Sequence, residues 1–139
     1  MYHIVCPAKY RKAVITEEVD TKLREVCLGI EARYEIKFLE IGVEKDHVHF
    51  LVQSVPQYNP KQIVQTIKSI TEGKIFESCP EVKKALWGGQ FWTDGYYVGT
   101  VGEHGNELVL TEYVKNQGRN RDEYKKIYHK SQLELFQDL

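Results

Sequence analysis

Two hydrophobic periodicities alternate along this chain of 139 residues, and their order is the feature that most limits its fold. Apolar residues at every second position predict four strands, over residues 3–6, 33–38, 47–53 and 95–101. Helical spacing predicts three helices, over residues 17–30, 60–72 and 106–117. The resulting order, βαββαβ followed by a further helix, predicts an α+β fold of the ferredoxin-like kind. In that topology the first and third strands lie in the middle of an antiparallel sheet, both crossover helices cover one face, and the other face is left open for function.

Local signals set the ends of these elements. Thr16 is a suitable N-cap for the first helix, and Asn59 followed by Pro60 begins the second, which we expect to stop at Gly73. A third helix begins after Gly105-Asn106 and ends at Gly118. The strand phase slips at Leu39, which indicates that this strand bulges or ends there.

Composition limits the chain to one domain. The apolar fraction is 42%, enough for a single core, so we expect one domain over residues 1–139. The sequence contains neither eighteen consecutive apolar residues nor a signal-type N-terminus, and we therefore expect a cytoplasmic protein without membrane contact. The cysteines are odd in number, widely spaced and without a C-x-x-C pair, which predicts reduced, buried thiols at Cys6, Cys27 and Cys79.

Charge is unevenly distributed although the net charge is only -1. Residues 1–16 carry three basic side chains and no acid, and residues 113–130 carry six basic side chains against two acids. The rest of the chain therefore holds 10 basic and 18 acidic residues, a net of -8. If the two basic segments meet in the fold, they form a cationic patch for phosphates on an acidic body. The alternative is a solvated helix face and a loop.

The third predicted strand carries the sequence His47-Val48-His49. Because side chains alternate across a strand, both imidazoles should stand on one face while Val48 points to the helices. Two neutral imidazoles at this spacing can bind one divalent ion. The alternative is a pair of surface histidines on an edge strand, but this strand is predicted to be central.

A metal on two histidines needs a further ligand, and a carboxamide oxygen suits Mg²⁺ or Mn²⁺. The last predicted helix offers Tyr113 and Gln117, four residues apart and so on one face. A tyrosine beside a metal can attack phosphorus and form a covalent phosphotyrosine. Two other pairs share the spacing: Tyr58 with Gln62 straddles a helix start, whereas Tyr128 with Gln132 cannot be excluded by spacing.

Several short stretches in this order resemble the single-tyrosine transposases of the insertion sequence 200/605 family, members of the His-hydrophobic-His endonuclease superfamily. The matching stretches are Tyr2-His3-Ile4-Val5-Cys6-Pro7 with Lys9-Tyr10-Arg11, Asp46-His47-Val48-His49, Leu86-Trp87-Gly88 with Phe91-Trp92, Gly95-Tyr96-Tyr97-Val98 with Thr100-Val101-Gly102, and Tyr113 to Gln117. They cover nearly the whole chain. One departure lies in residues 3–6, where the family often has an aromatic residue.

The resemblance implies a site and an activity. His47, His49 and Gln117 would hold one Mg²⁺ or Mn²⁺ ion, and Tyr113 would be the nucleophile on a C-terminal helix. Such enzymes nick single-stranded DNA at the ends of a mobile element, keep the 5′ phosphate on tyrosine and reseal by the reverse attack, without ATP. The resemblance also implies a homodimer, in which the tyrosine helix of one subunit can serve the other, and recognition of a DNA hairpin near the element end.

The basic segments offer candidate DNA contacts. Lys9, Arg11 and Lys12 follow the first strand, and Lys115, Arg119 and Arg121 surround the tyrosine helix. Tyr10 or Phe76 could stack on bases. Trp87 and Trp92 are more often core anchors than stacking platforms, and Asp46 more often orients a histidine than binds metal. No partner can be named for His3, His104 or His129.

Two further functions fit the same residues. A noncatalytic module could bind single-stranded nucleic acid on the open face of the sheet, as many ferredoxin-like RNA-binding domains do. Such a module would bind equally well in chelator and leave the strand intact. A domesticated relative could instead cut repeated hairpins in a host chromosome.

Overall fold

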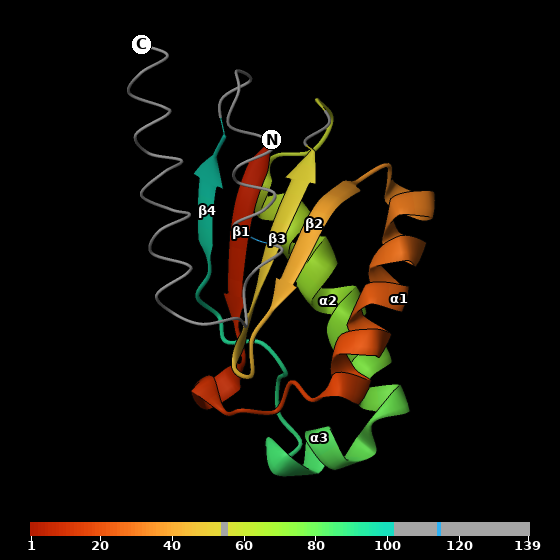
Figure 1. The fold of residues 1–139 in the computed structure, drawn as a ribbon, viewed down its shortest axis with the longest axis vertical. Coiled ribbons are helices and arrows are strands. Elements are labelled where there is room, and N and C mark those ends of the chain that lie inside the picture. The colour runs from red at the N-terminus through yellow and green to blue at the C-terminus, as the bar shows by residue number, and fades with distance from the viewer. Residues whose placement is uncertain (54–55, 102–113, 115–139) are drawn as a thin grey trace.

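The structure is a computed structural model that describes residues 1–53, 56–101 and 114. The strands are β1 (Tyr2–Pro7), β2 (Lys37–Val43), β3 (His47–Gln53) and β4 (Tyr97–Thr100). The helices are the 3₁₀ turn η1 (Lys9–Arg11), α1 (Glu17–Tyr34), α2 (Pro60–Ser78) and α3 (Pro80–Ala85). The strands form one antiparallel sheet of order β2-β3-β1-β4 (Figure 1). This is the predicted α+β, ferredoxin-like arrangement, with β1 and β3 central.

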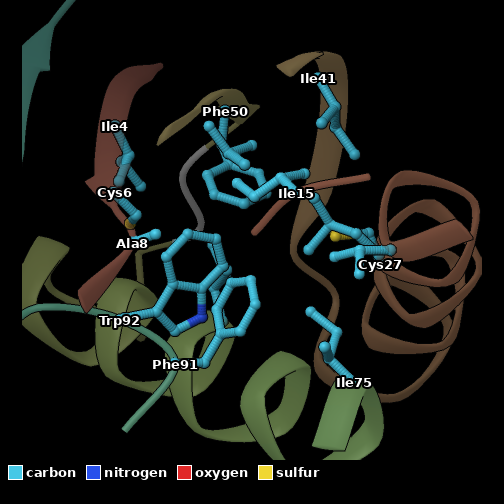
Figure 2. Packing of buried hydrophobic residues seen from close by; sticks show 14 of the residues in the cluster. Ile4, Cys6, Ala8, Ile15, Cys27, Ile41, Phe50, Ile75, Phe91 and Trp92 are labelled. Atoms are coloured by element: carbon cyan, nitrogen blue, oxygen red, sulfur yellow. The ribbon is translucent and has the colours of Figure 1, made fainter. Parts of the chain in front are cut away.

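The core lies between the sheet and the helices α1 and α2, which Figure 1 shows together on one side of the sheet. Ile4 and Cys6 from β1 and Phe50 from β3 point into it, as does Ile75 from α2 (Figure 2). Alternation along β1 and β3 explains this placement, because every second side chain reaches the helix layer. Burial of this apolar face is what holds the helices on the sheet.

The second strand begins later than predicted. Arg33 and Tyr34, expected at the start of that strand, form the last turn of α1. Tyr34 lies four residues after the buried Ile30 and packs against the core, so the helical stripe continues through it. Glu35 then adopts a left-handed conformation with φ 58° and ends the helix. The predicted irregularity at Leu39 is a bulge, because the pairing with β3 shifts between Phe38 and Glu40.

The second helix is longer than predicted and does not stop at Gly73. Ile67, Thr71 and Ile75 are spaced four apart and all are buried, so the stripe runs past the glycine. Glycine inside a helix costs about 1 kcal/mol relative to alanine. Burial of the Ile75 side chain contributes about 2 kcal/mol or more and outweighs that cost. The short helix α3 that follows was not predicted, and β4 is shorter than the expected strand over 95–101.

The two tryptophans have different surroundings. Trp92 is 2% exposed, packs edge-on against Phe91 and donates its indole N–H to Thr71 Oγ1 at 2.9 Å. Its predicted role as a core anchor is confirmed (Figure 2). The same prediction is wrong for Trp87, which is 73% exposed.

The three cysteines are buried and form no disulfide, as predicted. Burial raises the pKa of Cys6 and of Cys27 to about 12, which keeps both thiols protonated and unreactive. Among the described residues, no helix has the length and apolar character that crossing a membrane requires.

Thr71 allows a test of the buried hydrogen bond to Trp92. Thr71→Val removes the acceptor and leaves the indole N–H unpaired in the core, so we expect a loss of about 1–3 kcal/mol in the free energy of unfolding. Thr21→Val is the matched control. The hydroxyl groups of Thr21 and Thr71 each donate to the backbone carbonyl four residues earlier, but Thr21 lies on the exposed face of α1. Its expected effect is within about 0.5 kcal/mol. Equal denaturation midpoints for the two variants would contradict this assignment.

Candidate functional site

His47 and His49 stand on the same face of β3, as the alternation predicts. Val48 between them is fully buried in the core on the opposite face. The two imidazole rings meet edge to face, with centroids 5.1 Å apart. The alternation along β3 therefore places the two imidazole rings next to one another.

The turn before β3 supplies acidic partners for His47. Asp46 Oδ1 lies 2.7 Å from His47 Nδ1, and Glu44 Oε2 lies 3.5 Å from His47 Nε2. Asp46 is also paired with Arg11, whose Nε is 3.3 Å from Asp46 Oδ2. Partial burial would raise the pKa of Asp46, but the hydrogen bond with His47 and the charge of Arg11 outweigh it and lower the pKa. Asp46 is thus an ionised carboxylate, which accepts a hydrogen bond when His47 Nδ1 carries a proton.

His49 has a partner that the sequence reasoning missed. Nε2 of His3, from β1, lies 2.9 Å from Nδ1 of His49, and the two rings are stacked with centroids 5.2 Å apart. His3 pairs with Leu51 across the strands, two residues along from the pairing of Val5 with His49 and therefore on the same face. The signal was present, since Ile4 and Cys6 face the core and alternation puts His3 on the histidine face.

The predicted open face is not open at His49. His49 is only 7% exposed, and the neighbouring Leu51 is fully buried on the same face. The ring of His3 lies over His49, and Tyr97 from β4 meets His3 edge-on at 6.0 Å. Burial first, and then the charges of His3 and His47, lower the pKa of His49 to about 3. Burial also lowers the pKa of His3. His49 is therefore neutral at physiological pH, the form that can bind a metal.

Both histidines are held through the same ring atom. The partner of His47 Nδ1 is Asp46, and the partner of His49 Nδ1 is His3. When each Nδ1 carries the proton and donates it, each Nε2 presents a lone pair. Metal-binding histidines are commonly oriented in this way through their second ring nitrogen. The donor set thus fits a divalent ion, and ligand atoms of Glu44, Asp46 and His47 also lie within 4.8 Å of one another.

The described structure includes only some of the predicted site residues. His47, His49, Lys9, Tyr10, Arg11 and Lys12 are described, and the last four form or adjoin η1 at the end of β1. Tyr113, Gln117, Lys115, Arg119 and Arg121 lie outside the described residues. Of the predicted helix over 106–117, only Val114 is described, and it is helical and buried. Phe76 packs against the core beside Phe91, which does not suit base stacking.

Sequence comparisons give a consistent result. Residues 1–117 match the family described as "Transposase IS200 like". The chain is 30% identical over 116 residues to ISDra2 transposase TnpA of Deinococcus radiodurans, which covers 84% of this chain and 82% of that protein. It is 29% identical over 120 residues to the transposase for insertion sequence element IS200 of Salmonella typhimurium, covering 84% of this chain and 75% of that protein.

Solved structures agree with the sequence comparisons. A transposase crystal structure from Deinococcus radiodurans R1 superposes with a TM-score of 0.67 at 29% identity, covering 86% of this chain and 91% of that one. A REP-associated tyrosine transposase bound to a REP hairpin superposes with a TM-score of 0.58 at 10% identity. That match covers 81% of this chain and 62% of the other, and at such low identity it shows the fold alone.

The low pKa of His49 predicts acid sensitivity in the metal-free protein. In the unfolded chain His49 binds a proton below about pH 6.5, whereas in the folded protein it stays neutral until about pH 3. The unfolded state therefore binds more protons in this range, and the free energy of unfolding falls as the pH falls. Between pH 7 and pH 5 this amounts to about 2 kcal/mol in the free energy of unfolding, with a further loss of the same sign from His3. Denaturant unfolding of the metal-free protein, with chelator present, measures this loss at pH 7 and pH 5. The His49→Gln variant should lose less free energy of unfolding between the two pH values than the unaltered protein does. An equal loss in the two proteins would contradict a low pKa for His49.

Proposed function

Because this chain belongs to the IS200/IS605 family of transposases, we propose that it cuts and rejoins single-stranded DNA at the ends of a mobile element. The reaction would pass through a 5′-phosphotyrosine intermediate, with Tyr113 as the nucleophile. One domain over residues 1–139 would carry the whole activity. The observation that carries the proposal is the pair of neighbouring imidazoles, His49 buried and His47 half-buried, each contacted at its Nδ1 atom.

The metal site would consist of His47, His49 and Gln117. A bound Mg²⁺ or Mn²⁺ ion would polarise a phosphoryl oxygen and stabilise the charge that develops on it. Asp46 and His3 would act as positioning residues, because each contacts a nitrogen that faces away from the proposed ligand atom. Glu44 lies close enough to His47 to add a carboxylate oxygen. Such a mixed set of nitrogen and oxygen ligands is compatible with either ion.

The phenol oxygen of Tyr113 would attack the phosphorus of the scissile linkage. The bond from phosphorus to the 3′ oxygen breaks, the 3′ oxygen takes up a proton, and the 5′ phosphate stays on tyrosine. The phenol must lose its own proton, and an unperturbed phenol, with a pKa of about 10, is ionised to only about one part in a thousand at pH 7. Attack by a 3′ hydroxyl reverses the step and releases the tyrosine. The number of ester bonds is conserved, so no nucleotide cofactor is needed.

The DNA partner would be a single strand with a hairpin near the element end. Lys9, Arg11, Lys12, Lys115, Arg119 and Arg121 would contact phosphates, and Tyr10 would contact a base. The proposal of a DNA partner rests on the family to which the chain belongs. A homodimer would allow the tyrosine helix of either subunit to complete the site of the other.

Replacing the nucleophile tests the proposal. The protein is incubated with Mn²⁺ and single-stranded oligonucleotides that tile the DNA flanking its gene, and covalent adducts are separated on a denaturing gel. We expect Tyr113→Phe to lower adduct formation on the order of a thousandfold or more, because phenylalanine lacks the phenol oxygen that would attack phosphorus. Tyr128→Phe is the matched control and should form the adduct normally. An adduct that persists in Tyr113→Phe would remove this residue from the role. Intact DNA with the unaltered protein would instead favour the noncatalytic binding module.

The positioning residues allow a test that does not depend on cleavage. We expect His3→Phe and Asp46→Asn each to weaken Mn²⁺ binding by about 10- to 100-fold, measured by titration calorimetry, because each loses the partner that orients a ligating ring. Asp20→Asn is the matched control: Asp20 is paired with Arg24 on α1, as Asp46 is with Arg11. An unchanged affinity in both site variants would show that the ion does not bind at these histidines.

A further inference from the structure

Two exposed aromatic rings lie together at one end of the sheet. Trp87 is 73% exposed and Tyr10 is 60% exposed, and their rings meet edge to face with centroids 5.3 Å apart. Large aromatic side chains normally lie in the core, so a pair of them held in solvent is informative. We propose that Tyr10 and Trp87 form a stacking platform for unpaired bases of the DNA strand beside the histidine site. The inference rests on the proposed function and adds the place where the strand is held.

The backbone holds both rings outward in unusual conformations. Tyr10 and Arg11 in η1 have φ of 60° and 53°, and Trp87, two residues after α3, has φ of 55°. Among the described non-glycine residues with positive φ, Trp87 and Glu35 each end a helix, where the left-handed conformation is common, so only Tyr10 and Arg11 lack that explanation. Two such residues in one turn are held there by their surroundings, and residues of this kind concentrate at functional sites. Here the outliers come from two chain segments that meet at the same surface.

Cations accompany the rings. Lys12 Nζ lies 3.9 Å from the centroid of the Trp87 ring and donates to the carbonyl of Ala85 at 2.9 Å. Lys9 Nζ lies 5.6 Å from the Tyr10 centroid. An exposed ring with an ammonium over one face suits a nucleotide, because a base can stack on the opposite face while its phosphate pairs with the cation. Residues 1–16 contain no acid that would repel a phosphate.

The platform is tied to the histidine site through Arg11, which is paired with Asp46, the partner of His47. A backbone hydrogen bond joins the same two segments, since Ala8 N–H donates to the carbonyl oxygen of Asp46 at 2.8 Å. Figure 1 shows η1, the turn between β2 and β3, and the α3 segment at the same end of the molecule. A strand lying across the platform therefore leads directly to the histidines. Duplex bases are already stacked on one another, so the occupant must be single-stranded.

The chain is suited to a fluorescence test because it contains two tryptophans, and Trp92 is buried. Short oligodeoxythymidylate should quench the emission of Trp87, whereas an abasic oligomer of the same length, which keeps the phosphates, should quench it weakly. Trp87→Phe should lose the quenching but retain most of the affinity, because the ring remains. Trp87→Ala should bind oligodeoxythymidylate about 5- to 150-fold more weakly and should no longer distinguish it from the abasic oligomer.

Controls separate this inference from the proposed function. Leu28→Ala removes another exposed apolar side chain, 67% exposed on α1, and should bind as the unaltered protein does. Denaturant midpoints confirm that each variant folds. Equal binding by Trp87→Ala and the unaltered protein, or no response of Trp87 emission to the DNA, would overturn the platform and leave the rings as a contact for another protein. The proposed function is tested separately: a covalent adduct between Tyr113 and DNA would support it even if Trp87 does not bind bases.

Discussion

The antiparallel pairing of β1 with β3 is the interaction on which the rest of this structure depends. On one face it joins Ile4 and Cys6 to Phe50, and so provides the apolar surface that α1 and α2 cover. On the other face the same register brings His3 against His49. Because side chains alternate, one set of backbone hydrogen bonds fixes the core and the histidine site together. A slip of one residue would exchange the two faces and destroy both.

The site also depends on a chain of polar contacts that crosses between segments. Arg11 forms an ion pair with Asp46, and Asp46 is hydrogen-bonded to His47. The turn that follows β1 is therefore linked to the first residue of β3. On the other side His3 holds His49. Both contacts act on Nδ1, and they set ring orientation before any ligand binds. Preorganisation of this kind matters for catalysis because groups that are already placed need not be reordered during the reaction.

Much of the fold could be predicted, and the errors have identifiable causes. The hydrophobic period predicts the order of the four strands and of helices α1 and α2, and the ferredoxin-like topology with this order predicts that β1 and β3 are central. Gly73 predicts an end to α2 that is too early, because burial of the Ile75 side chain outweighs the cost of a glycine. Residue type predicts a core position for Trp87, but the turn after α3 directs its side chain into solvent. The sequence indicates no partner for His3, because the residue that it contacts lies 46 positions away.

The sequence by itself determined what depends on short-range pattern: the order of the four strands and of helices α1 and α2, and that His47 and His49 share a face. Local periodicity decides these properties, since it fixes the direction of each side chain relative to its own element. The tertiary structure alone decided which residues from different elements meet. The contact of His3 with His49, the pairing of Arg11 with Asp46 and the meeting of Tyr10 with Trp87 depend on strand register and on the paths of two turns. No local pattern encodes these, because they arise only when distant segments pack.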